Sequence, residues 1–276
     1  MEGIETKENL PQPRLEIRQE KSLEFIAQSI HSYEDVGDEE AVFMLALTLE
    51  HPEWKDDILE QIKKHKPHVK DVGKILERLE KDYFSSGWQS QIQPNAEDAI
   101  WWTEHLPEAK MRITNLISYF RPSADEIAKK VVIIPSDRLL PSKETGQSFH
   151  IGDTTVIMSH TENPMNLEHE FLHGIINPIT EELAGEIPQE KVVALASEKL
   201  KKGEEYGEHA LSLLNEELIR TYNEFIENEK LNIAIINNEL REIVYQLYQR
   251  FNKERKTNPK IKFKDFFARE IKSLFG

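Results

Sequence analysis

The sequence contains no cysteine, so the chain can form no disulfide bond and can offer no thiolate to a metal ion. It also lacks any apolar run near the roughly 18 residues of a membrane-spanning helix, and we therefore expect no membrane span. Residues 1–13 are polar and do not contain the apolar segment of a secretion signal. Together these absences favour a cytoplasmic location.

Positive charge is scarcer than negative charge, with 35 Lys and Arg residues against 50 Asp and Glu residues and a net charge of −15. Binding to nucleic acid relies on neutralising phosphates, so this balance argues against a nucleic-acid partner. A hydrophobic content of 38% beside 31% charged residues is typical of a soluble globular protein.

The C-terminal segment 250–276 departs from this balance, because nine Lys and Arg residues outnumber three Asp and Glu residues there. Its apolar residues have the spacing of one buried helix face: Phe263, Phe266, Phe267, Ile271 and Leu274. We therefore expect the segment to dock onto the acidic body of its own chain. Binding to an anionic membrane or to nucleic acid is the alternative.

Residues 169–173 have the pattern H-E-x-x-H. On a helix, His169 and His173 lie one turn apart on the same face, so both imidazoles can reach a single divalent ion. Glu170 lies about 100° round the helix from His169, where its carboxylate can exchange a proton with a water at that ion. Asn163-Pro164 and Asn177-Pro178 predict the start and the end of this helix. The motif therefore predicts metal-dependent hydrolysis.

A catalytic zinc site of this kind needs one more protein ligand beside the two histidines. The segment 213–220 has the apolar spacing of an amphipathic helix and carries two neighbouring carboxylates, Glu216 and Glu217. Either one can approach the metal from a second, packed helix. The alternative is that both are solvated, and that the two histidines only cap or hydrogen-bond a helix on an acidic surface.

H-E-x-x-H followed downstream by Asn215-Glu216 resembles the gluzincins, the thermolysin-like zinc metallopeptidases. More narrowly, the pattern H-E-F-x-H, then Asn177-Pro178, Tyr206 and N-E-x-L-x-R at 215–220, looks like a little-studied group of H-E-x-x-H proteins of unassigned substrate. The resemblance covers about residues 130–225. It departs from the gluzincin pattern at Arg220, where an acidic partner for a ligand histidine is expected.

The resemblance implies a zinc ion held by His169, His173 and Glu216, which selects Glu216 over Glu217. It further implies that Glu170 activates a water and that Tyr206 stabilises the oxyanion. His209 and Arg220 share a helix face with Glu216. Arg220 can bind a substrate carboxylate or, as we expect, form an ion pair with a neighbouring glutamate.

Strand-forming segments precede the motif. The segment 131–135 reads as a short buried strand, and 148–150 and 154–159 read as two strands about a turn at 151–153. In zincins an edge strand before the active helix pairs with the substrate backbone, and Thr154–Ser159 is the candidate for that role. A hairpin within the core is the alternative.

Apolar stripes at helical spacing predict helices over most of the remaining chain, namely at 23–30, 42–49, 72–79, 95–102, 111–120, 230–251 and 263–274. Ser123–Glu126 has the pattern of a capping box before a further short helix. We predict an α+β fold, mostly α. It has a flexible N-terminus (1–13), a helical part (14–122) and a zincin-like unit with a small sheet and a helical C-terminal tail (123–276).

The sequence thus predicts a zinc-dependent peptidase that acts on a peptide or protein substrate. Two alternatives stay open: a catalytically inactive zincin that serves as a binding module, and a zinc enzyme that hydrolyses a non-peptide amide. Ligation requires neutral imidazoles, so activity should fall as the pH drops through histidine protonation.

Overall fold

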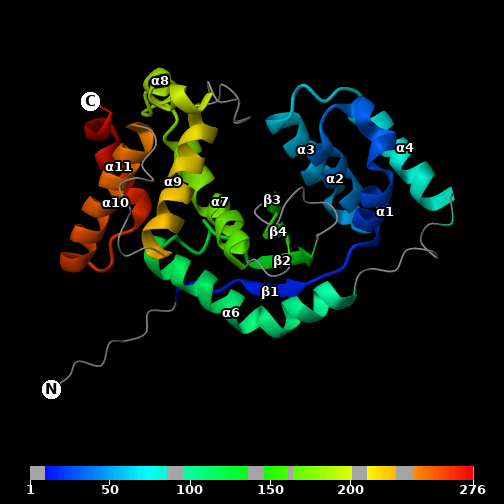
Figure 1. Cartoon of the computed structure of the whole chain (residues 1–276), viewed down its shortest axis with the longest axis horizontal. Coiled ribbons are helices and arrows are strands. Elements are labelled where there is room, and N and C mark those ends of the chain that lie inside the picture. Colours follow the sequence, from blue (N-terminus) through cyan, green and yellow to red (C-terminus); the bar gives the residue numbers. More distant parts are fainter. Residues whose placement is uncertain are drawn as a thin grey trace. The chain divides into compact units, whose positions relative to one another are not determined.

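The computed structural model describes residues 10–85, 87, 96–135, 146–160, 164–200, 210–227 and 239–275. The fold is mostly helical with a small mixed sheet of four strands (Figure 1), which confirms the α+β, mostly α class. No helix in these ranges is both long and apolar enough to cross a membrane.

Backbone contacts divide the chain into two compact units, each built from separate segments. The first, which we call the sheet unit, comprises Pro13–Lys110 and Ala128–Leu167. The second, which we call the helical unit, comprises Met1–Gln12, Met111–Ile127 and Glu168–Gly276. The sequence boundary at residue 122 is not a limit of either unit, because segments on both sides of it belong to each.

The sheet has the strand order β1-β2-β4-β3. Its strands are β1 (Arg14–Ile17), β2 (Lys130–Pro135), β3 (Gly146–Ile151) and β4 (Thr154–Ser159). β2 pairs in parallel with both β1 and β4, whereas β3 and β4 form an antiparallel hairpin. Strands β2, β3 and β4 confirm the prediction. β1 was missed, because its alternation of polar and apolar residues extends over only four residues, too few to identify a strand.

The position of β4 corrects the expected role of Thr154–Ser159. This strand lies between β2 and β3, so its backbone is paired on both sides and it is not an edge strand. A hairpin can join the sheet through either of its strands, and the alternating pattern is the same in both cases. The sequence therefore predicted the hairpin correctly and could not show which strand lies inside.

Helices cover one face of the sheet within the sheet unit. They are α1 (Lys21–Ser29), α2 (Glu39–Leu47), α3 (Lys55–His65) and α4 (Val72–Ser85), with short 3-10 segments η1 (Ile30–Val36) and η2 (Pro52–Trp54). Alternate strand residues such as Val132, Ile134, Val156 and Met158 share one core with these helices. α2 is apolar on all sides and buried from residue 41 to 47, as expected of a helix inside a core.

Asp38 caps the N-terminus of α2. Its carboxylate accepts a hydrogen bond from the Ala41 N–H at 2.8 Å and lies 3.1 Å from Lys66 Nζ and 2.8 Å from His68 Nε2. Burial raises the pKa of Asp38, but these contacts outweigh burial and hold the pKa below its ordinary value of 3.8. The ionised carboxylate thus stabilises the fold.

We expect Asp38→Ala to lower the free energy of unfolding by about 1–2 kcal/mol, because the cap is lost. Asp38→Asn keeps a capping oxygen and should lose less. A pKa that is lower in the folded state means that the stabilisation is present above pH 3.8 and is lost as the pH falls below it. Urea unfolding of wild type and Asp38→Ala should therefore converge in acid, and a difference that stays constant with pH would contradict this account.

α6 (Ala96–Phe120) is one helix where the sequence predicted two, and Pro107 lies in its interior. Trp102, Ala109, Ile113 and Leu116 are all buried, so one apolar face continues past the proline. Burial of that face outweighs the single helix hydrogen bond that proline cannot donate.

The predicted helix after Ser123 is absent, because residues 124–127 form turns that lead into β2. Half of the predicted capping contact forms nevertheless, since the Ser123 N–H donates to Glu126 Oε2 at 2.5 Å. The local contact was thus predicted correctly and the helix was not.

The helical unit contains the end of α6, most of α7 (Pro164–Glu182), and α8 (Gln189–Leu200), α9 (Ala210–Glu227), α10 (Glu239–Thr257) and α11 (Phe263–Leu274). The predicted helix at 230–251 begins outside the described residues and corresponds to α10 from Glu239 onward. α8 had no predicted counterpart.

The basic C-terminal segment docks on its own chain, as expected. Phe263, Phe266 and Phe267 are buried, and the Phe263 ring stacks on Tyr248 with 5.6 Å between centroids. Lys264 lies 3.0 Å from Glu126 and 2.7 Å from Glu182. The apolar face of α11 therefore enters the core of the helical unit while its cations pair with carboxylates of the same unit.

Candidate metal centre

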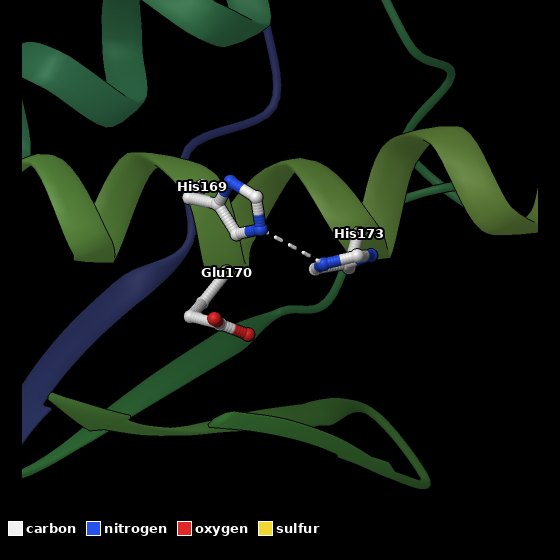
Figure 2. Close-up of side chains that lie close together, drawn as sticks. All are labelled: His169, Glu170 and His173. Carbon is white, nitrogen blue, oxygen red and sulfur yellow. Dashed lines mark hydrogen bonds between the residues drawn. The ribbon is translucent and has the colours of Figure 1, made fainter. Parts of the chain in front are cut away.

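α7 carries the H-E-x-x-H motif within the helical unit. The rings of His169 and His173 lie on the same side of the helix, and their Nε2 atoms are 3.3 Å apart (Figure 2). One nitrogen of each ring and one carboxylate oxygen of Glu170 lie within 4.8 Å of one another. The helix thus brings two imidazoles and one carboxylate to a common point, as the spacing predicted.

α7 begins at Pro164, as predicted, but it continues past Asn177-Pro178 to Glu182, so the predicted end was wrong. Ile179 on this last part is buried, and so are Leu172, Ile175 and Ile176 on the turns before it. As in α6, burial of a continuous apolar face outweighs the hydrogen bond that proline cannot make.

α9 places a third donor beside the two histidines. Glu216 Oε1 lies 3.3 Å from His173 Nε2, and Glu216 Oε2 lies 3.7 Å from His169 Nε2. The side chains of His169, His173 and Glu216 are 23%, 18% and 15% exposed. Three donors from two helices therefore converge at a partly buried point that solvent can still reach.

Glu217, the neighbouring candidate, lies on another side of α9. Its carboxylate accepts a hydrogen bond from Arg241 Nε on α10 at 2.7 Å, and both side chains are buried. The structure thus brings Glu216 rather than Glu217 to the histidines, which is the choice that the family resemblance implied.

Two further contacts hold these donors in place. Asn177 Oδ1 lies 3.4 Å from His173 Nδ1, an arrangement that favours a proton on Nδ1 and leaves Nε2 as the acceptor that faces Glu216. Thr180 Oγ1 donates to Asn215 Oδ1 at 2.6 Å, and both residues are buried. This second bond ties α7 to α9 next to Glu216.

The sequence interpretation missed both Asn177 and Thr180. Asn177 was read as part of a helix stop and of the family pattern but not as a partner of His173, although it follows His173 by four residues and therefore shares its helix face. That spacing was the available signal for Asn177. No comparable signal pointed to Thr180, whose partner Asn215 lies on another helix.

The charges of the site favour a cation at its centre. Burial alone would raise the pKa of Glu216, but hydrogen bonds with His169 and His173 outweigh it and lower the pKa to about 2. Burial would lower the pKa of His173, whereas the contact with Glu216 and the negative charge of Glu170 raise it. In the absence of a metal the ionised Glu216 thus attracts a proton to His173, and a divalent cation can take the place of that proton.

Arg220 donates from Nε to Glu216 Oε2 at 3.1 Å, so the ion pair expected from the sequence is present. Tyr206 and His209, the remaining candidates on this side, lie outside the described residues. The expected oxyanion role of Tyr206 stays a prediction.

Comparisons of this chain with family models, with curated proteins and with solved structures found no match. The geometry and chemistry of the site are therefore the basis for a functional assignment.

Proposed function

We propose that this chain is a zinc-dependent peptidase of the gluzincin type, in which His169, His173 and Glu216 hold the metal and Glu170 transfers protons. The convergence of the three donors carries the proposal, with two of their distances at the spacing of zinc ligands and the third, from His169 Nε2 to Glu216 Oε2, slightly longer at 3.7 Å. A tetrahedral zinc ion with bonds of about 2.0–2.1 Å keeps its ligand atoms about 3.3–3.4 Å apart. The distances from His173 Nε2 to His169 Nε2 and to Glu216 Oε1 are both 3.3 Å.

The donor types agree with this spacing. Two imidazole nitrogens and one carboxylate oxygen are the protein ligands of peptidase zinc sites, which leave the fourth position open. Partial exposure of all three side chains is consistent with access to that position. Glu170 is only 6% exposed and has a carboxylate oxygen within 4.8 Å of both histidine nitrogens. A buried base next to the metal donors favours hydrolysis over a purely structural zinc site.

Zinc at this site would polarise the scissile carbonyl and lower the pKa of a water, which is the chemistry that the protein residues cannot supply. Glu170 accepts a proton as the water oxygen attacks the carbonyl carbon. It then gives that proton to the leaving nitrogen as the C–N bond breaks. The products are a carboxylic acid and an amine, and Glu170 returns to its ionised form.

Metal analysis tests the ligand set. We expect about one zinc per wild-type chain, and loss of zinc in His169→Ala and Glu216→Ala, because each variant lacks one of three donors. His31→Ala is the matched control, since the His31 side chain is 89% exposed and its ion pair is with the nearby Glu34. Wild type without stoichiometric metal, or with iron or manganese in place of zinc, would contradict the proposal.

Cleavage of a mixed peptide library tests the activity. We expect hydrolysis that a chelator abolishes and added zinc restores. A zinc-loaded wild type that leaves the library intact would favour one of the two rivals, an inactive zincin that serves as a binding module or an enzyme for a non-peptide amide. A screen of non-peptide amides would then separate those two.

A further inference from the structure

The two oxygens of the Glu216 carboxylate have different partners. Oε1 lies 3.3 Å from His173 Nε2, which is the closest approach of Glu216 to either histidine. Oε2 is the oxygen nearest to His169, at 3.7 Å from its Nε2, and it accepts a hydrogen bond from Arg220 Nε at 3.1 Å. Arg220 follows Glu216 by one helical turn on α9, so the backbone itself holds the guanidinium at this oxygen.

A carboxylate can bind a metal through one oxygen or through both. Binding through both would add a ligand to the site and occupy part of the position that a hydrolytic site keeps for water and substrate. A guanidinium remains protonated at any pH at which the protein is folded, and its hydrogen bond to a carboxylate is charge-assisted. The hydrogen bond from Arg220 to Oε2 is therefore retained at any pH at which the protein is folded.

Arg220 is positively charged, whereas the family resemblance implied an acidic residue at this position. An acidic residue one turn after the glutamate would orient a ligand histidine, and here the neutral amide of Asn177 contacts His173 instead. The residue one turn after Glu216 therefore does not orient a ligand histidine, and Arg220 at this position contacts Glu216 instead. Its nitrogen contacts Oε2, whereas Oε1 is the oxygen in contact with His173.

We infer that Arg220 is a positioning residue that holds Glu216 Oε2, so that Glu216 binds the metal through Oε1 alone and the coordination number stays at four. This inference rests on the proposed metal site. It concerns how Glu216 binds and not whether it binds.

X-ray absorption of the zinc-loaded protein measures the number of nitrogen and oxygen neighbours directly. We expect four in wild type and five in Arg220→Met, because Oε2 loses its partner and can turn to the metal. Arg220→Lys should restore four, since the contact with Glu216 runs through a single nitrogen that an ammonium group can replace. The cobalt-substituted proteins should show the same change, as a weaker visible absorption in Arg220→Met.

Arg250→Met is the control for loss of an ion pair in the same unit, because Arg250 pairs with Glu270 at 3.2 Å on another helix pair. It should keep the wild-type spectrum. An unchanged coordination number in fully loaded Arg220→Met would overturn the inference and leave the proposed function intact. A wild type that binds no metal would overturn the proposed function itself.

A measurement on wild type alone keeps the inference testable if Arg220→Met does not fold. The infrared difference between zinc-loaded and metal-free protein reports the two carboxylate stretches of Glu216. A wide separation between them is expected for binding through one oxygen. A narrow separation, typical of binding through both, would overturn the assignment of Arg220.

Discussion

Replacing Glu170 with glutamine is expected to lower kcat/KM for peptide hydrolysis by about 10²–10⁴-fold, the usual contribution of a general base, while zinc stays bound. Glutamine has the shape of glutamate but cannot accept and return a proton. The metal should remain, because the proposed ligands His169, His173 and Glu216 are all kept in this variant. Steady-state kinetics together with zinc analysis of the same preparation measure both effects.

Glu168→Gln is the matched control for this variant. Glu168 lies two positions from Glu170 on the same helix, but its carboxylate pairs with Arg112 at 3.3 Å. Its replacement should leave kcat/KM within a few-fold of wild type. Activity retained in Glu170→Gln would remove Glu170 from the reaction, and zinc lost in proportion to activity would make it a ligand instead.

The part of the site that lies on one helix could be predicted from the sequence. The relative positions of His169, Glu170 and His173 depend only on helix geometry, which the local pattern predicts. The approach of Glu216 could not be predicted in the same way. It lies 43 positions beyond His173, and its position depends on how α9 packs, including the bond between Thr180 and Asn215. The resemblance to a family, and not the spacing, selected Glu216 over Glu217.

The fold shows the same division between local and long-range information. Apolar stripes predicted α1, α4, α9 and α11, because each has apolar residues at a clear helical period. α2 was also predicted, although it is apolar on all sides. The predicted end of α7 at Asn177-Pro178 was wrong, since α7 continues through Pro178, just as α6 continues through Pro107. A rule based on local sequence considers only the hydrogen bond that proline cannot donate. In the folded protein the helix is also stabilised by burial of the apolar face that continues beyond the proline. The order of the strands in the sheet could likewise not be predicted from the sequence, because it depends on pairing between distant segments.

Replacing Arg241 with methionine is expected to lower the free energy of unfolding by about 3–5 kcal/mol, the usual effect of breaking a buried ion pair. Arg241 donates to Glu217 at 2.7 Å and to Glu224 at 3.1 Å. Glu224 is 30% exposed and can be hydrated, whereas Glu217 would keep a buried charge without its guanidinium. Urea unfolding measures the loss as a shift of the midpoint at constant slope.

The double variant Glu217→Leu/Arg241→Met tests whether charge is the cause. It removes both buried charges and replaces them with apolar groups, so it should recover most of the lost stability. Arg269→Met is the control, because Arg269 is 52% exposed and the loss of its pairs should cost no more than about 1 kcal/mol. If the double variant is as unstable as Arg241→Met, then Arg241 stabilises the helical unit by packing its aliphatic stem between α9 and α10 and not by neutralising Glu217. In either case α9 is held to α10 at Glu217, the residue next to the proposed metal ligand Glu216. The two variants therefore also show how far the candidate metal centre depends on a contact that takes no part in its chemistry.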